Sequence, residues 1–155
     1  MTDEPAHEIS ELEAHDCWTL LRSTTVGRLA VSIDDRPEIF PINFVTDHGT
    51  IVFRTSEGTK LAAALTARHV AFEVDGYDPD AGDAWSVVVK GDAEEITQTP
   101  EVLETMTFPL FPWHAGPKPR FVRVVPVEVS GRRFQVTDPG GWHTSMTGAP
   151  HSPSE

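Results

Sequence analysis

Residues 26–55, VGRLAVSIDDRPEIFPINFVTDHGTIVFRT, hold three apolar segments separated by two turn signals. Apolar residues recur with a period close to two from residue 26, which is typical of a β-strand with one buried face. Residues 34–36 (DDR) have the composition of a turn, and residues 47–49 (DHG) are a hairpin signal. Turns this short join antiparallel neighbours. The stretch therefore predicts a β-meander with its second strand at 37–46 and its third at 50–55.

Pro41 lies inside the second predicted strand. Proline has no backbone N–H, so it removes one donor from the hydrogen-bond ladder of a sheet. This residue predicts an edge, a bulge, or a place where something other than a strand pairs.

The remaining chain supplies three more predicted strands, at 70–74, 85–96 and 121–129, with 131–136 as an extension of the last. Gly91 marks a candidate bulge in the fifth strand. Short helices are expected over about 11–22, 58–67 and 100–106, the first with a capping box formed by Ser10 and Glu13. Residues 75–83 read as an acidic loop. Six strands in meander order predict a mainly β fold, a small antiparallel barrel with short helices.

A chain of 155 residues suits one domain, which we expect over residues 10–137. Residues 1–9 are polar and are predicted to be a flexible N-terminus, and residues 138–155 have the composition of a disordered tail. Residues 107–119 (TFPLFPWHAGPKP) are too apolar for a solvated linker and too proline-rich for a regular element. We expect them to lie over another surface, such as a partner subunit.

The net charge of −12 argues against nucleic acid or an anionic membrane as the main partner. The sequence has no run of 18 apolar residues and no apolar N-terminal region of a signal peptide, and its one cysteine, Cys17, cannot form an internal disulfide. We therefore expect a cytoplasmic protein. The seven histidines show no metal-binding spacing, so no metal is expected.

Residues 53–60 (FRTSEGTK) carry the strongest local signal of a binding site. A strand ends, a hydroxyl-rich turn follows, and a helix begins, whose first N–H groups lack partners and attract anions. Two cations and three hydroxyls add to this, which predicts a phosphate-sized anion site: Arg54, Thr55, Ser56, Thr59 and Lys60. The alternative is a helix capped by Ser56 or Thr59 with two solvated basic side chains.

Three further residues have two interpretations each. Asn43, the only asparagine, either faces solvent or reads the hydrogen-bonding edge of a ligand. Trp85 and Trp113 belong to the core or a subunit interface by default, and each could instead stack on a planar ligand.

Taken together, the order of these elements resembles the pyridoxamine 5′-phosphate oxidase-like family, which has the FMN-binding split-barrel fold, and in particular its small actinobacterial and nitroimidazole-reductase-like branch. The resemblance covers about residues 10–136. It rests on residues 26–30 (VGRLA), 40–44 (FPINF), 51–55 (IVFRT) leading into 58–60 (GTK), 85–91 (WSVVVKG) and 131–134 (GRRF).

The resemblance implies a six-stranded split barrel that forms a homodimer, with two flavin sites at the subunit interface. The phosphate would be held by the loop after Phe53, the same site that the local signal indicates. Phe40, Pro41, Ile42 and Asn43 would run along the isoalloxazine ring. Trp113 or Trp85 from the other subunit is the candidate cover of the ring.

Two departures bear on the reaction. Residues 40–45 (FPINFV) replace the Arg-x-Val-Leu-Leu-Lys strand of pyridoxamine phosphate oxidases proper, and no histidine completes an Arg-x-His motif after residues 131–134. Oxidation of pyridoxamine phosphate is therefore not expected, and no catalytic side chain is assigned.

The resemblance implies a flavin-dependent oxidoreductase that transfers hydride through FMN to or from a small-molecule electron donor or acceptor. One alternative is a reductase that uses the deazaflavin coenzyme F-420, whose acidic tail would need a basic groove, for which the candidates are Lys90, Arg120, Arg123, Arg132 and Arg133. The other is a non-catalytic flavin-binding or flavin-sensing module.

Overall fold

The structure is a computed structural model, and it describes residues 9–56, 58–66, 68–97 and 119–136. The described elements, in chain order, are β1 (Ile9–Glu11), α1 (Ala14–Arg22), β2 (Val26–Ile33), β3 (Arg36–Asp47), β4 (Thr50–Ser56), α2 (Lys60–Ala64), β5 (His69–Asp78), β6 (Asp83–Glu95) and β7 (Pro119–Gln135). The fold is therefore mainly β with short helices, as predicted. The expected helix over 100–106 and nearly all of the proline-rich segment 107–119 lie outside the described residues.

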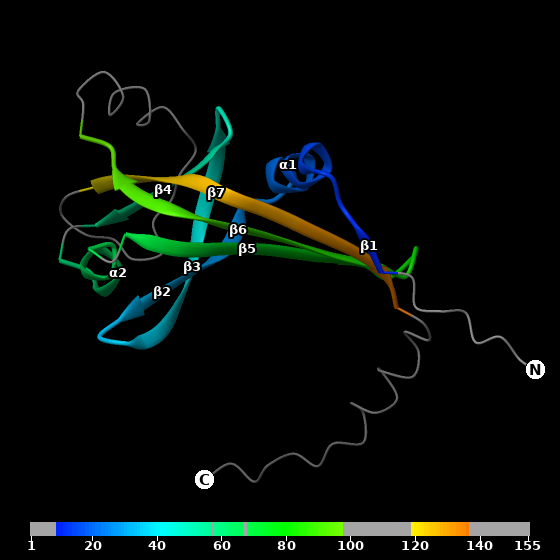
Figure 1. The fold of residues 1–155 in the computed structure, drawn as a ribbon, viewed down its shortest axis with the longest axis horizontal. Helices are drawn as coiled ribbons and strands as arrows, with labels where there is room; N and C mark the ends of the chain where they lie inside the picture. The colour runs from blue at the N-terminus through cyan, green and yellow to red at the C-terminus, as the bar shows by residue number, and fades with distance from the viewer. Residues whose placement is uncertain (1–8, 57, 67, 98–118, 137–155) are drawn as a thin grey trace, which may run out of the picture.

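The strands form one antiparallel sheet in the order β1-β7-β4-β3-β2-β5-β6, and an additional pairing of β6 with β7 closes it (Figure 1). The closed ring consists of six strands, β2 to β7, which confirms the predicted six-stranded antiparallel barrel. The predicted meander order was wrong after the third strand, because β5 crosses over to pair with β2 and β4 pairs with β7. The seventh strand, β1, adds to the ring by pairing with the end of β7.

The prediction for the first helix was wrong at its start. Ser10 belongs to β1, and its hydroxyl donates to the carbonyl of Arg133 at 3.4 Å instead of capping a helix. Helix α1 begins at Ala14, and its N-cap, Glu13, makes no side-chain capping bond. The reason is that the edge of β7 offers a row of unpaired backbone groups, and a paired strand satisfies several of them where a capping box satisfies two.

The strands are longer than the sequence predicted. β5 continues to Asp78 and pairs there with Asp83, so residues 79–82 alone form the turn and most of the expected acidic loop is strand. Gly76 permits this, because its missing side chain leaves room for the Trp85 ring, whose nearest atoms would lie 2.6 Å from a Cβ. The predicted bulge at Gly91 is confirmed by a register shift between Lys90 and Gly91. Helix α2 is shorter than the expected 58–67.

Two apolar clusters lie on opposite faces of β4. Ile51 and Phe53 are fully buried in the main core inside the barrel, where α1 contributes Cys17 and Leu21. Val52 faces the other way and packs in a second, smaller cluster that contains Ile96 and Phe121. Since successive strand residues alternate between faces, Thr55 continues the inner row and Arg54 continues the outer row.

The barrel is split along β3. Residues 36–43 pair only with β2 among the described residues, and the pairing with β4 begins at Phe44. The N–H of Phe44 donates to the carbonyl of Thr25, just before β2, at 3.0 Å. Counting back from Phe44, the backbone groups of every second β3 residue point to β2, and those of the residues between them point away from β2. The backbone groups of residues 37, 39 and 41 therefore point to the unpaired edge. Two of these residues are prolines, so the prediction of an edge at Pro41 is confirmed.

Candidate functional site

The loop after β4 brings two hydroxyl groups together. Oγ1 of Thr55 lies 3.1 Å from Oγ1 of Thr59, and Thr55 is 4% exposed. Thr59 is the N-cap of α2: its hydroxyl accepts from the N–H of Ala62 at 3.1 Å and donates to the carbonyl of Ser56 at 2.8 Å. The capping interpretation of Thr59 is therefore correct. Because α2 has only five residues, its dipole is small, and an anion here would depend mainly on side chains.

Lys60 stands at the start of α2, and its Nζ donates to Oε1 of Glu38 on β3 at 2.7 Å. The Lys60 side chain is 64% exposed and that of Glu38 is 36% exposed. Exposed ion pairs contribute little to stability, so Lys60 can exchange this partner for a phosphate at small cost. Glu38 was not foreseen from the sequence, since only the folded barrel brings β3 beside α2.

Arg54 carries the most distinctive polar group of the site. Its Nε is buried and has no hydrogen-bond partner within the described part of the chain. Leaving a buried donor unsatisfied is costly, so this atom marks a place where an acceptor is expected. The last β3–β4 pair joins Phe44 to Phe53. Arg54 and Asn43 are the next residues beyond this pair on the two strands, where the split in the barrel begins. Asn43 is half-buried and already engaged in an interaction.

The other predicted site residues fall into three groups. The side chains of Phe53 (0% exposed) and Ile42 (2% exposed) belong to the core, so any contact with a cofactor would have to come from their backbone atoms. Phe40 and Pro41 lie on the split part of β3.

Trp85 lies eight residues before Ala93 on β6, about 27 Å along the strand from the end that approaches the β4–α2 loop. One chain therefore does not bring Trp85 to the loop, and Trp113 is outside the described residues.

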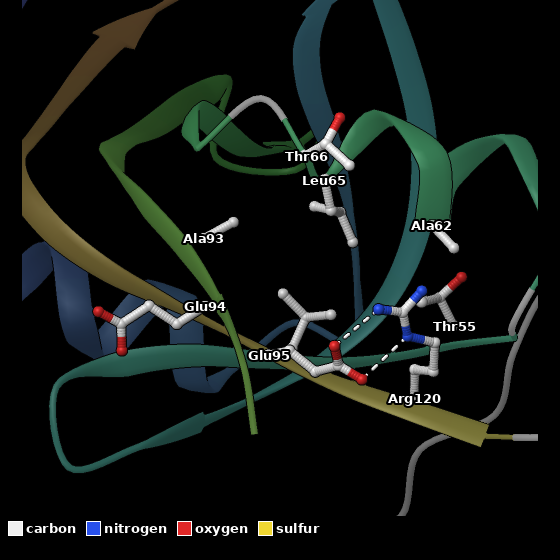
Figure 2. Close-up of a pocket in the computed structure, with 9 residues that line it drawn as sticks. Thr55, Ala62, Leu65, Thr66, Ala93, Glu94, Glu95 and Arg120 are labelled. Atoms are coloured by element: carbon white, nitrogen blue, oxygen red, sulfur yellow. Dashed lines mark hydrogen bonds and ion pairs between the residues drawn. The ribbon is translucent and has the colours of Figure 1, made fainter. Parts of the chain in front are cut away.

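A pocket of about 130 Å³ opens beside the loop, between α2 and the adjoining ends of β6 and β7 (Figure 2). The Arg120 guanidinium crosses it, held by Glu95 through hydrogen bonds from Nε at 2.9 Å and from Nη2 at 2.6 Å. These bonds hold the pKa of the Glu95 carboxyl below its usual range, although partial burial opposes them. Arg120 is also the strand partner of Thr55. Glu95 was missed from the sequence, where only a correct β6–β7 register would have placed it near Arg120.

The cations proposed for a basic groove do not form one. Arg123 donates to Asp47 at 3.0 Å under the β3–β4 hairpin. Arg132 and Arg133 pair with β1 at the far end of β7 from Arg120, and Lys90 sits in the middle of the β6–β7 ladder.

Within the described residues, no group of three or more His, Cys, Asp or Glu side chains could hold a metal ion. None of the described helices has the length and apolar character required to cross a bilayer.

Residues 13–133 match the family model of pyridoxamine 5′-phosphate oxidase. The chain belongs to this family. The resemblance that the sequence suggested is thereby confirmed, over nearly the same range.

Relatives in the family include proteins that bind flavins. A FAD-binding protein from Mycobacterium smegmatis is 40% identical, with a TM-score of 0.72, over 81% of this chain and 100% of that chain. A FAD-binding protein from Mesorhizobium loti is 25% identical, with a TM-score of 0.68, over 84% of this chain and 99% of that chain. An uncharacterised Mycobacterium tuberculosis protein is 31% identical over 136 residues, which cover 84% of this chain and 89% of that protein.

Proposed function

We propose that this protein is a flavin-dependent oxidoreductase of the cytoplasm, with FMN, or the FMN half of a larger flavin, bound where the barrel splits. The observation that carries the proposal is the buried Nε of Arg54 at the beginning of the split, which has no hydrogen-bond partner among the residues that the structure describes. Family membership and the flavin-binding relatives support it. The phosphate would be bound by Arg54, Thr55, Ser56, Thr59 and Lys60, with Lys60 released from Glu38.

The polar edge of the isoalloxazine ring would lie along the open edge of β3. The ladder leaves the carbonyls of Ile39 and Pro41, and the N–H of Ile39, directed to that edge. These groups suit a planar ring that both donates and accepts hydrogen bonds, with the Asn43 amide at the end of the row. A bound flavin supplies the hydride-transfer chemistry, and the protein's contribution is to bind, orient and shield it.

We also propose that the protein acts as a homodimer, with the outer face of the sheet as its interface. This face holds a shallow apolar hollow of about 630 Å³, lined by residues that include Ala30, Ala71 and Val127. Val127 is 79% exposed and Ile39 is 67% exposed, which is unusual for aliphatic side chains of a folded chain. Sedimentation equilibrium tests this: wild type should be a dimer, and Val127→Lys should shift it to monomer. A monomeric wild type would contradict the proposal.

The function is tested by titrating the protein with FMN and following flavin fluorescence. Removing the Arg54 charge should weaken binding by about 10- to 100-fold, as expected for one charge-assisted hydrogen bond. Lys60→Ala should weaken it less, since Lys60 must leave Glu38. Arg22→Ala on α1 is the matched control, because Arg22 is exposed and bonds only within its own helix among the contacts described. An equal affinity of Arg54→Ala and wild type for FMN would contradict the assignment of Arg54 to the phosphate site.

Turnover separates the oxidoreductase from its alternatives. The flavin-loaded protein should be reduced by NADPH or another donor and reoxidised by a quinone or nitro compound. Tight binding without reduction of any acceptor would favour a binding or sensing module. Preferential binding of the deazaflavin coenzyme F-420 would favour the second alternative, although the scattered cations do not provide a groove for its acidic tail.

A further inference from the structure

An ion pair crosses the split in the barrel. Beyond the pair of Phe44 with Phe53, β3 and β4 separate, and residues 36–43 of β3 pair only with β2 among the described residues. Lys60 begins α2, shortly after β4, and its Nζ donates to Oε1 of Glu38 on this free part of β3 at 2.7 Å. The bond therefore joins the two sides of the split.

Neither side of the split depends on this ion pair for its place in the fold. Ile42 anchors β3 in the main core and is 2% exposed, and Ala64 anchors α2 there and is 1% exposed. The side chains of Lys60 and Glu38 are in contact with water. An exposed ion pair of this kind favours the joined arrangement over the separated one by only a few-fold. The ion pair can therefore break and re-form while the barrel stays folded.

The place of Glu38 on β3 indicates a role other than phosphate binding. Its carboxylate repels a phosphate and occupies Lys60, the cation that the phosphate would use. Glu38 also precedes Ile39, whose backbone N–H and carbonyl point to the open edge of β3. An isoalloxazine ring along that edge would enter the split, and the ion pair lies across its path.

We propose that Lys60 and Glu38 form a latch that holds the split closed in the flavin-free protein, and that a flavin phosphate opens it by taking Lys60 from Glu38. The inference rests on the proposed flavin function and adds a regulatory step to it. The latch weakens the binding of every flavin, because only the open fraction of the protein accepts a ring. Only a phosphorylated flavin gains Lys60 in return, so Lys60 opposes the binding of one flavin and favours the binding of another.

Riboflavin distinguishes a latch from simple competition for Lys60, because it is uncharged and has no phosphate. Its dissociation constant and that of FMN are measured for the full chain by flavin fluorescence. Glu38→Gln and Lys60→Ala both remove the latch, so each should bind riboflavin about two- to fivefold more tightly than wild type does. The double variant should bind riboflavin no more tightly than either single variant. For FMN the two variants should differ: Glu38→Gln should bind it more tightly than wild type, and Lys60→Ala more weakly.

Glu94→Gln is the matched control. Glu94 is an exposed carboxylate that also lies beside the end of α2, where it lines a pocket with Leu65 and Thr66, but its ion-pair partner is Arg68, at 4.0 Å. This variant loses the same charge as Glu38→Gln and leaves the latch intact. It should bind riboflavin with the affinity of wild type.

The outcomes separate the latch from the flavin function. Riboflavin affinity that is equal in wild type, Glu38→Gln and Lys60→Ala, or that stays undetectable in all three while FMN binds, overturns the latch and leaves the flavin function standing. A loss of riboflavin affinity in Lys60→Ala also overturns the latch, since Lys60 would then favour the binding of a flavin that has no phosphate. If neither flavin binds any of these proteins, both proposals are overturned.

Discussion

Arg123 near the start of β7 donates a hydrogen bond from Nη1 to Oδ2 of Asp47 at 3.0 Å, and so ties β7 to the hairpin between β3 and β4. The same Nη1 also donates to the hydroxyl of Thr50 at 2.7 Å. Both charged side chains are less than one-fifth exposed. Burial raises the pKa of the Asp47 carboxyl, but the hydrogen bonds from Arg123 and His48 outweigh it, so that the pKa lies below its usual value.

We predict that Asp47→Asn lowers the free energy of unfolding at pH 7 by about 2 kcal/mol, because it leaves Arg123 partly buried without its counter-charge. A carboxyl with a lowered pKa stabilises the folded state above its unfolded pKa of 3.8, and this contribution is lost as the pH falls through the folded value. The difference between wild type and variant should therefore shrink below about pH 4. Urea unfolding at pH 7 and pH 3 measures it, with exposed Asp80→Asn as the control. A difference that is independent of pH would contradict the assignment.

The bulge in β6 gives a second prediction. A Cβ at Gly91 would lie 2.2 Å from the carbonyl oxygen of Val125, a backbone atom that cannot move without disturbing β7. Gly91→Ala should therefore lower the stability by about 2 kcal/mol or more, as for other strained backbone sites. Lys90→Ala at the neighbouring exposed position should change it by less than about 0.5 kcal/mol. Thermal unfolding of the two variants compares them, and equal melting temperatures would show that the bulge relaxes.

What the sequence predicted correctly depends on neighbouring residues. The hairpin at residues 47–49 could be read locally, and in the structure His48 and Gly49 both have positive φ, at 47° and 72°. Gly91 could be recognised because a glycine inside a strand marks a bulge or a close approach. The hydroxyl pair of Thr55 and Thr59 likewise lies within one short loop.

What the sequence could not predict depends on pairings between distant residues. β1 pairs Ile9 with Phe134, and no local signal favours this over the capping box. The ion pair of Glu95 with Arg120 needs the register of two strands. The opposite directions of Arg54 and Thr55 could have been inferred, since adjacent strand residues alternate between faces. The anion site was instead described as one convergent cluster. The structure brings Thr55 and Thr59 together, whereas the Arg54 side chain leaves β4 on the opposite face and would have to reach past the end of the strand to bind the same phosphate.

Cys17 lies under β7, where it is fully buried against Gly131, and a Cβ at Gly131 would approach its Sγ to 2.6 Å. Burial and the nearby Asp16 raise the pKa of the thiol. Since the thiolate is the reactive form, native Cys17 should react with Ellman's reagent at least 100-fold more slowly than in urea. Fast labelling of the native protein would mean that α1 opens readily from the barrel. In Gly131→Ala, which forces α1 outward, the native rate should rise.

The last prediction concerns Glu73 on β5, which lies between Arg28 and Asp75. Nε of Arg28 donates to Oε1 of Glu73 at 3.0 Å, and Nη2 of Arg28 lies 3.2 Å from Oδ1 of Asp75. Burial raises the pKa of the Glu73 carboxyl; Arg28 lowers it, and Asp75 raises it again, with a net result above the usual 4.5. The folded state therefore binds a proton at a higher pH than the unfolded chain, and stability from this group falls as the pH rises from 4.5 through the folded pKa.

Glu73→Gln removes the titration, so wild type should gain more stability than the variant when the pH is lowered from 7 to 5. Chemical unfolding at these two pH values measures the effect, with exposed Glu11→Gln as the control. If the stabilities of wild type and Glu73→Gln depend on pH in the same way, the pKa of Glu73 is not raised in the folded state, which would contradict the prediction.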